Sequence, residues 1–204
     1  MFDSISGLKD AVFHSGLADS SETLASEKKW YRALSQRAAV CMIVSDHPQL
    51  GPSLLMIQRA IHAGDPWSGQ MAFPGGKHET DDAHITATAL RELEEELSIS
   101  DQYLRRFARL SDILARPYRP LKKPMVVTPL LFESSVIDLN PKPNHEVADV
   151  LWVPLQTFHS ENRQTMQWKK NGVPIQLPCY YFEDKKIWGL SLMMIDELLS
   201  ALRQ

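Results

Sequence analysis

The sequence predicts an α+β fold in which helices cover a mixed β-sheet. Two buried, strand-like runs lie close together in residues 38–59, and further strand candidates follow in the second half of the chain. Two segments with helical spacing of apolar residues occur at 83–97 and at about 190–202. Mixed strands with a few helices at their faces favour an α/β sandwich over a doubly wound sheet.

The first 35 residues are expected to be a helical extension. Apolar residues recur at helical spacing in residues 4–13, and a second such segment runs through Trp30, Tyr31 and Leu34. With 204 residues, the chain has room for one main domain, which we place at residues 36–204, after the extension at residues 1–35.

Composition limits the function classes. The chain is 44% hydrophobic and 23% charged, which is typical of a soluble globular protein with a buried core. Its net charge of −3 gives no broad basic surface, so we expect no nucleic acid partner. No apolar run approaches the roughly 20 residues that span a bilayer, so we expect no membrane partner.

The two cysteines, Cys41 and Cys179, lie far apart in the chain and form no C-x-x-C pair. We expect each to be a small buried side chain in a reducing compartment. The N-terminus lacks the basic and apolar regions of a secretory signal. The expected location is cytoplasmic.

The first strands are predicted from continuous apolar runs. Residues 38–44 form one run and residues 53–59 another, and the short link containing Gly51 and Pro52 suggests a hairpin. Residues 69–76 are expected to be a short strand that ends in a Gly-Gly loop. Asp81 or Asp82 is then expected to cap the helix at 83–97.

Three more strands are predicted at residues 107–115, 125–132 and 147–153. The loop at 116–124, rich in proline and basic residues, is typical of an exposed, substrate-facing segment. A hairpin is predicted with Trp168 before its turn and residues 175–182 after it. The last helix is expected to place one set of apolar residues on a single face: Leu190, Met193, Met194, Leu198 and Leu202.

The helix at 83–97 has an unusual density of negative charge. Glu92, Glu95 and Glu96 fall at i, i+3 and i+4, so they share one face. Like charges at these spacings cost roughly 0.2–0.5 kcal/mol per pair, and a hard divalent cation such as Mg²⁺ reverses that cost. An apolar stripe on the opposite side allows the helix to be buried while its carboxylates face a cleft.

These residues resemble the motif of the Nudix hydrolases, G-x5-E-x7-R-E-U-x-E-E-x-G-U, in which U is aliphatic. Gly76 matches its first glycine, and the later part matches Arg91-Glu92-Leu93-Glu94-Glu95-Glu96-Leu97-Ser98-Ile99 except at one position. The resemblance implies an α/β/α sandwich with a mixed sheet. It also implies hydrolysis of a nucleoside diphosphate linked to another group, with Mg²⁺ or Mn²⁺.

The chain departs from this motif at two places. Fourteen residues separate Gly76 from Arg91, one more than in the general pattern. Counted from Gly76, the first acidic position is Asp82; counted back from Arg91, it is Ala83. Ser98 also replaces a glycine that would end the helix in a left-handed conformation, which serine adopts less readily. We therefore expect a different exit turn and no lost ligand.

The one-residue insertion is similar to that of coenzyme A pyrophosphatase-like Nudix proteins, and this resemblance covers roughly residues 36–204. It is carried by Gly69–Gly76, by Val127-Thr128-Pro129 and by Val153-Pro154-Leu155. The coenzyme A signature of that branch is only partly present: Arg59, Gly69 and Gln70 match, but residues 65–68 differ.

The resemblance and the residue chemistry together suggest roles. We expect Glu92, Glu95 and Glu96 to hold the metal and Arg91 to orient Glu95 through an i, i+4 ion pair. One of these glutamates, or Glu146 in a later loop, is the candidate base. Gly75 and Gly76 allow close backbone approach to phosphate. The remaining candidates are the phosphate contacts Arg59, Arg116, Arg119, Lys122 and Lys123 and the stacking residues Trp67, Tyr118 and Trp152.

Three functions remain open from the sequence. The first is hydrolysis of coenzyme A or a derivative to 4′-phosphopantetheine and adenosine 3′,5′-bisphosphate. The second keeps this chemistry with ADP-ribose, NADH or a nucleoside triphosphate as substrate. The third is a non-catalytic, nucleotide-binding regulatory module. From the family resemblance alone we also expect a homodimer.

Overall fold

The structure is a computed structural model that describes residues 4–14, 35–65, 67–115, 123–136, 139–170 and 172–201. In this part of the chain the α-helices are α1 (Ile5–His14), α4 (Ile85–Leu97) and α5 (Gly189–Ala201). Three short 3₁₀ helices lie at η1 (Asp101–Tyr103), η2 (Leu155–Phe158) and η3 (Ser160–Asn162).

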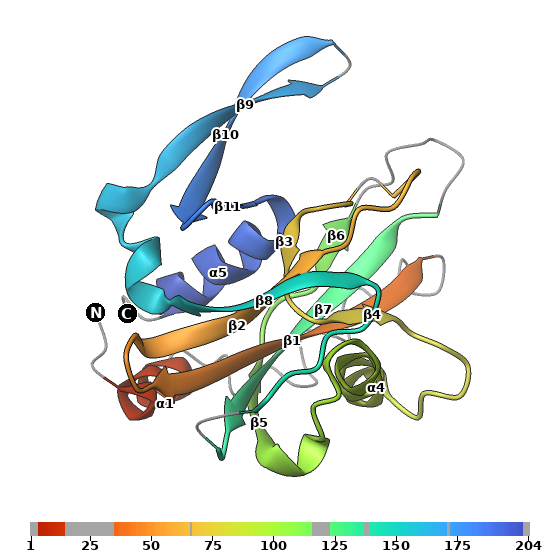
Figure 1. Cartoon of the computed structure of the whole chain (residues 1–204), viewed down its shortest axis with the longest axis vertical. Helices are drawn as coiled ribbons and strands as arrows, with labels where there is room; N and C mark the ends of the chain where they lie inside the picture. The colour runs from red at the N-terminus through yellow and green to blue at the C-terminus, as the bar shows by residue number, and fades with distance from the viewer. Residues whose placement is uncertain are drawn as a thin grey trace.

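A mixed β-sheet forms the centre of the molecule (Figure 1). Its path runs β3-β2-β1-β7-β5, and three further strands pair with β1, β7 and β2. The β1–β2 pair is antiparallel, which confirms the predicted hairpin, whereas β1 and β7 are parallel. The strands are β1 (Gln36–His47), β2 (Gly51–Arg59), β3 (Met71–Ala72), β4 (Gly75–Lys77), β5 (Leu104–Arg109), β6 (Ile113–Ala115), β7 (Met125–Ser134) and β8 (Val147–Pro154).

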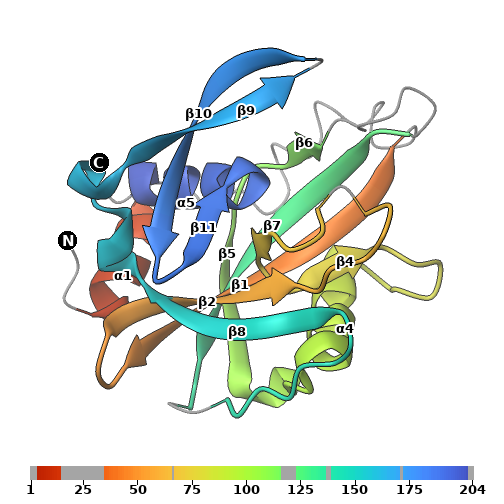
Figure 2. The same cartoon turned by 45° about the horizontal axis from the view of Figure 1, so that its top comes forward.

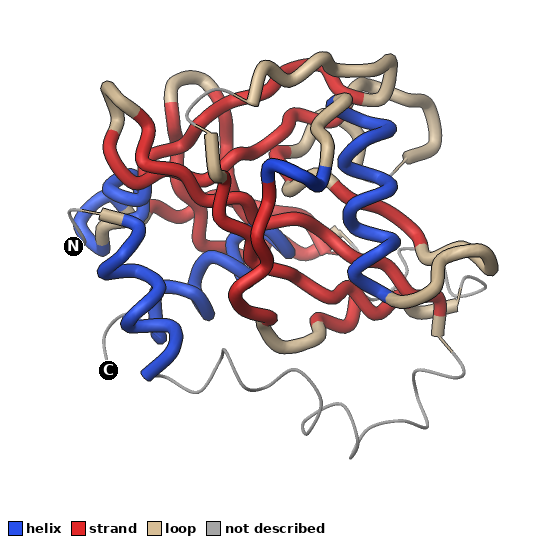
Figure 3. The backbone as a smooth tube through the Cα atoms, turned by 90° about the horizontal axis from the view of Figure 1, so that it is seen from below, coloured by secondary structure: helices blue, strands red, loops and turns tan. Residues whose placement is uncertain are grey.

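The sheet is buried on both faces, as the continuous apolar run in β1 predicts. Met42 and Val44 belong to the cluster that includes residues of α1 and α5, whereas Cys41 and Ile43 belong to the cluster under α4. Successive side chains thus enter opposite layers, and Figure 3 shows the strands between helices on two sides. The predicted α/β/α sandwich of the α+β class is confirmed.

A three-stranded antiparallel sheet, β11-β10-β9, lies beside α5 (Figures 1 and 2). It comprises β9 (Gln164–Lys170), β10 (Val173–Phe182) and β11 (Lys185–Trp188). The β9–β10 pair confirms the predicted hairpin, and β11 was not predicted. Tyr180 and Ile187 are buried in the same core cluster as α5, so this sheet and the helix share one apolar interior.

Helix α1 confirms the helical spacing predicted for residues 4–13. The Asp46 carboxylate accepts a hydrogen bond from the Ile5 N–H at 3.0 Å, and Lys9 forms an ion pair with Glu133 at 2.9 Å. Leu8 and Val12 are buried against the sheet. The segment through Trp30, Tyr31 and Leu34 lies outside the described residues.

Two predicted strands are each divided. Residues 69–76 contain β3, which pairs with β2, and the start of β4, which pairs with β1, because Pro74 and Gly75 turn the chain between them. Residues 107–115 are split between β5 and β6. The break faces Pro129 of β7, whose carbonyl accepts from the Leu110 N–H at 3.1 Å but which has no N–H of its own for the ladder.

The face predicted for the last helix is partly wrong. Met194 and Leu198 are buried, but Met193 is 54% exposed because the neighbours Leu192 and Ile195 occupy the core face. Leu202 lies outside the described residues. None of the helices in the described ranges has both the length and the apolar character of a membrane span.

Candidate active site

Helix α4 is closed at its start by a histidine. His84 has an extended backbone, and its Nδ1 accepts a hydrogen bond from the Ala87 N–H at 3.0 Å. The prediction that Asp81 or Asp82 caps this helix is therefore wrong. The helix begins at Ile85, one turn later than Asp82, because the acidic loop before it turns toward Arg91 instead.

The C-terminal end of α4 is capped by Ser98 and by the loop that precedes β8. Ser98 adopts the left-handed conformation at φ 55° and donates its N–H to the Glu94 carbonyl, so the expected change of exit turn is wrong. Asn144 donates to the carbonyls of Glu95 and Glu96, and the Lys142 N–H donates to that of Leu97. These bonds satisfy the orphan carbonyls of the last turn and hold the loop before β8 against the helix.

Glu96 is the most buried carboxylate of the cluster. It is 3% exposed, and its Oε2 accepts a hydrogen bond from the Gly75 N–H at 2.9 Å. Burial raises the pKa of Glu96 to about 7, the Gly75 N–H opposes this rise, and repulsion from Glu92 and Glu146 adds to it. Glu96 is thus poised to gain or lose a proton near neutral pH.

Glu92 lies against the backbone of Gly76. A Cβ atom added to Gly76 would overlap the carboxylate of Glu92, so only glycine leaves room for this contact. Burial raises the pKa of Glu92, and the adjacent Arg91 opposes the rise. The two carboxylates at i and i+4 are both desolvated, an arrangement that disfavours two negative charges without a cation.

The site of Gly75 excludes a side chain more strictly than that of Gly76. Its φ is +145°, and a Cβ there would collide with the backbone of Ala39 and Val40 in β1. This close approach allows the Gly75 N–H to point at Glu96. The glycine pair therefore brings the β4 backbone onto the carboxylate face of α4.

Arg91 organises the exposed side of the cluster. Its Nη1 donates to Glu95 Oε2 at 3.1 Å, which is the predicted i, i+4 ion pair. Its Nη2 donates to Glu92 Oε1 at 3.1 Å and to the Lys77 carbonyl at 2.9 Å. One guanidinium thus links two carboxylates of α4 to the backbone of β4.

Asp82 fixes the position of Arg91 through an ion pair. The Arg91 Nε donates to Asp82 Oδ1 at 3.0 Å, and Asp82 also accepts from the Thr88 hydroxyl and the Glu79 N–H. The Arg91 bonds, together with the other donors, hold the pKa of Asp82 well below its usual range. Its side chain is 5% exposed, so the aspartate is a buried, fully ionised anchor.

Glu146 and Arg59 line the same cavity as the α4 carboxylates. The Glu146 carbonyl accepts from the Ala60 N–H at 2.7 Å, which ties its loop to the end of β2. Arg59 Nη2 pairs with Asp65 at 2.8 Å, while its buried Nε has no hydrogen-bond partner among the described residues. Arg59 lowers and Glu146 raises the pKa of Glu96, which shows that both act on the same carboxylate.

These groups line one cavity with a volume of about 710 Å³. One end is polar and contains the α4 carboxylates, Arg91, Arg59 and Glu146. The other end is apolar and aromatic, and it is formed by β7, the small sheet and α5. Its apolar lining includes Trp67, Met125, Val127, Trp168, Trp188, Leu190 and Met193.

The cavity brings together most of the predicted site residues. Glu92, Glu95, Glu96 and Glu146 line it together with Arg59, Gly75, Gly76, Arg91 and Trp67. Arg116, Tyr118, Arg119 and Lys122 lie outside the described residues, and Lys123 is exposed and not part of the lining.

Two aromatic residues of the cavity were not predicted. Of the candidate stacking residues, Trp152 packs with the cluster under α4 and contacts His47, and it does not line the cavity. Trp168 and Trp188 line the cavity instead, with ring centroids 4.8 Å apart. Trp168 and Trp188 lie apart in the sequence, where the hairpin pattern was the only signal. A hairpin pattern predicts strands, but it does not predict that they line the same cavity as α4.

The oxygen-rich donor set fits a hard divalent cation, because Glu92 and Glu96 are both desolvated and repel each other, with Arg91 as counter-charge to Glu92 and Arg59 as counter-charge to Glu96. In the described ranges, however, no three acidic, histidine or cysteine side chains are already arranged to hold a metal ion. Glu96 faces Gly75 while Glu95 turns outward to Arg91 and its side chain is 56% exposed. The three predicted ligands lie on one cavity wall but are not preassembled.

Comparison with known proteins supports this architecture. The family model described as NUDIX domain matches residues 34–174. The Nudix hydrolase NudL of Yersinia pestis (strain Pestoides F), itself uncharacterized, is 28% identical over 181 residues, which cover 87% of this chain and 85% of the relative. A NudL from Yersinia pseudotuberculosis serotype O:1b (strain IP 31758) gives the same values. A MutT/nudix family protein from Enterococcus faecalis shares the fold, with a TM-score of 0.50 and 18% identity over 95% of this chain and 74% of that one.

Proposed function

The chain belongs to the Nudix family, since the NUDIX model matches more than half of it, and from this premise we propose that its substrate is coenzyme A or a coenzyme A derivative. The coarser activity follows from the family: the protein is a pyrophosphohydrolase that acts on a nucleoside diphosphate derivative. The finer proposal gives 4′-phosphopantetheine and adenosine 3′,5′-bisphosphate as products. The observation that carries it is one cavity with a carboxylate end and a long apolar, aromatic end.

The two ends of the cavity suit the two parts of such a substrate. The diphosphate lies at the polar end, where Arg59 has a buried Nε without a partner among the described residues and is therefore available to an oxygen of the substrate. The apolar end, with Met125, Leu190 and Met193, offers a surface for the pantetheine arm.

Nudix hydrolases generally need a divalent cation, and we propose Mg²⁺ or Mn²⁺ held by Glu92, Glu95 and Glu96. A cation bound there neutralises diphosphate charge and makes a bound water more acidic. Arg91 fixes the direction of Glu95, and the Gly75 N–H fixes that of Glu96. Glu146, which lines the same cavity, is the proposed acceptor of the proton of the attacking water. Water adds to one phosphorus atom, and the bridging oxygen leaves with the other phosphate.

A second substrate class is supported by the segment next to Arg59. Residues 65–68 differ from the coenzyme A signature, and Asp65 in this segment pairs with Arg59 Nη2 at 2.8 Å. The segment thus offers other contacts than the signature does, and ADP-ribose, NADH or a nucleoside triphosphate is the alternative substrate for the same chemistry.

A product assay by mass spectrometry tests the proposal. The purified protein with Mg²⁺ or Mn²⁺ is incubated with coenzyme A, acyl-coenzyme A, ADP-ribose, NADH and nucleoside triphosphates in separate reactions. The proposal predicts preferred cleavage of coenzyme A or its acyl form to the two products named above. Preferred cleavage of another compound would support the second substrate class instead of coenzyme A. If no compound is cleaved, both substrate proposals are contradicted.

We also propose a homodimer in the cytoplasm. The free, buried thiols of Cys41 and Cys179 suit a reducing compartment. The family resemblance alone supports the dimer, because Met193 of α5 lines the substrate cavity and Trp30 lies outside the described residues. Sedimentation analysis tests the dimer, and a monomer at micromolar concentration would contradict it.

A further inference from the structure

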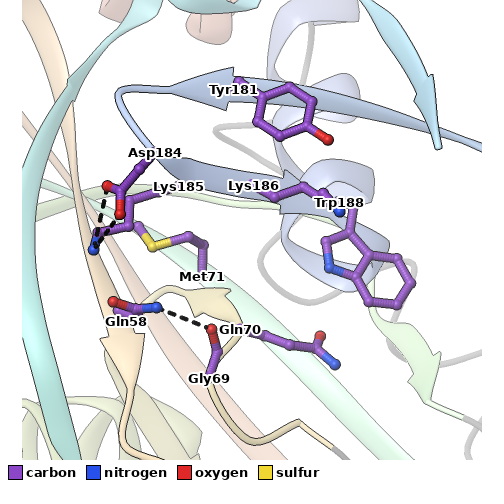
Figure 4. A pocket seen from close by; sticks show the side chains of 9 residues that line it. All are labelled: Gln58, Gly69, Gln70, Met71, Tyr181, Asp184, Lys185, Lys186 and Trp188. Carbon is purple, nitrogen blue, oxygen red and sulfur yellow. Dashed lines mark hydrogen bonds and ion pairs between the residues drawn. The ribbon is translucent and has the colours of Figure 1, made fainter.

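A second cavity, of about 440 Å³, adjoins the candidate active site beside the β10–β11 turn. Gln70, Met71 and Trp188 line both cavities, so the two spaces meet along these three residues. Figure 4 shows Trp188 between Lys186 and Gln70, with Tyr181 on the neighbouring strand beyond Lys186. The second cavity therefore lies directly beside the catalytic one.

The two lysines of this second cavity differ in their surroundings. Lys185 pairs with Asp149 and with Asp184, each at 3.4 Å. The Lys186 ammonium lies 5.7 Å from the centre of the Tyr181 ring and has no carboxylate partner among the described residues. Lys185 is thus neutralised within the protein, whereas Lys186 retains a charge that suits an anionic ligand.

The aromatic residues beside Lys186 indicate which class of anionic ligand suits the second cavity. Tyr181 and Trp188 provide ring surfaces next to the ammonium, and Gln70 adds an amide at the junction of the cavities. A purine nucleotide offers both a flat ring for such surfaces and a phosphate for the lysine. The chemistry of this corner matches a nucleoside that carries a phosphate monoester.

The distance to the carboxylate cluster is compatible with one ligand in both places. Five residues of chain lead from Gln70 to Gly75, so their Cα atoms are at most about 17 Å apart. Gly75 contacts Glu96 directly. A substrate with its diphosphate at Glu96 can therefore place the rest of its nucleotide near Lys186.

We propose that Lys186 determines specificity by binding a phosphate monoester that the substrate carries outside its diphosphate, namely the 3′-phosphate of the adenosine end of coenzyme A. This inference rests on the proposed function and extends it. Lys186 makes no bond to the reacting atoms and takes no part in proton transfer. It favours coenzyme A over the 3′-dephospho form and over ADP-ribose and NADH, which lack this phosphate.

The first test measures product binding without turnover. Calorimetry compares adenosine 3′,5′-bisphosphate with AMP for the wild type, Lys186→Gln, Lys186→Arg and the matched control Lys185→Gln. The wild type should bind the bisphosphate about tenfold more tightly than AMP, as loss of a charged hydrogen bond implies. Lys186→Gln should remove this preference, and Lys186→Arg and Lys185→Gln should keep it. A preference unchanged in Lys186→Gln, or equally reduced in Lys185→Gln, would overturn the inference.

The second test measures turnover of coenzyme A and 3′-dephospho-coenzyme A. Lys186→Gln should raise KM for coenzyme A about tenfold, leave kcat unchanged and leave both constants for the dephospho form unchanged. If coenzyme A turnover is the same in Lys186→Gln as in the wild type, this inference is overturned and the proposed function stands. A bisphosphate preference that depends on Lys186, without coenzyme A turnover, would instead overturn the proposed function alone.

Discussion

Asp82 and Arg91 form a two-pronged ion pair, with Arg91 Nε 3.0 Å from Asp82 Oδ1 and Arg91 Nη2 3.2 Å from Asp82 Oδ2. The pair uses one edge of the guanidinium and leaves Nη1 for Glu95. Asp82 is itself held by the Thr88 hydroxyl and the Glu79 N–H. The direction of Glu92 and Glu95, which we propose as metal ligands, therefore depends on an aspartate that does not line the cavity.

Asp82→Asn should lower both activity and stability. The neutral amide loses the charge that fixes Arg91, so Glu92 and Glu95 lose a common support, and we expect about a 10- to 100-fold drop in kcat/KM. The unfolding free energy should fall by about 1–2 kcal/mol, less than for a fully buried pair because Arg91 is partly exposed. Urea denaturation and substrate assays measure the two effects. Asp81→Asn, an exposed neighbour, is the control, and an equal loss there would refute the role of Asp82.

The same aspartate predicts a pH dependence of stability. The pKa of Asp82 is lower in the folded than in the unfolded chain, so the unfolded chain binds more protons on acidification and stability increases with pH. The contribution is complete above the unfolded value of about 3.9 and is lost as pH falls through and below it. The stability difference between wild type and Asp82→Asn should therefore be largest at neutral pH and shrink at pH 3. A difference that stays constant in urea titrations would contradict this account.

The raised pKa of Glu96 predicts the opposite dependence of stability on pH. Its folded pKa of about 7 exceeds the unfolded value of about 4.3, so the folded protein binds more protons between these values and stability falls as pH rises through them. Glu96→Gln should therefore stabilise the metal-free protein at pH 8, by on the order of 1–3 kcal/mol, and have little effect at pH 4. Thermal unfolding in a chelator measures this. Glu94→Gln, an exposed change on the same helix, should show no such dependence.

Gly76→Ala should damage the site through a single contact. The added methyl group overlaps the Glu92 carboxylate, so either Glu92 or the β4 backbone must move. We expect only a small loss in stability, because the tip of the Glu92 side chain can move, and a larger proportional loss of kcat. Gly172→Ala is the comparison, because its Cβ would meet open space and its φ of +83° gives backbone strain without a contact to the site. Equal activity losses in the two variants would show that strain, not Glu92, is the cause.

The local part of the site was predictable because it depends on helical spacing. The positions of Glu92, Glu95 and Glu96 follow from the 3.6-residue period, and the Arg91–Glu95 ion pair follows from i, i+4 geometry. The first acidic position was ambiguous, because counting from Gly76 and from Arg91 gives different residues. In the structure, Asp82, the position counted from Gly76, forms an ion pair with Arg91.

The distant part of the site was not predictable from these patterns. Trp168 and Trp188 meet because β9 and β11 flank β10, with Ile175 opposite Trp168 and Cys179 opposite Trp188. Period-two patterns predict strands but not which sheet they join or which helix they face. The same limit explains Met193, which helical spacing places with the core residues but which faces the cavity.

The most direct test of the central claim is coenzyme A turnover by the wild type, Glu96→Gln and Glu94→Gln in Mg²⁺, with both products quantified by mass spectrometry. The wild type and Glu94→Gln should release 4′-phosphopantetheine and adenosine 3′,5′-bisphosphate in equal amounts. Glu96→Gln should keep its fold, as measured by circular dichroism, and lose most of its turnover. Full turnover in Glu96→Gln would remove the buried carboxylate at Gly75 from the chemistry and contradict the assignment of this cavity as the active site.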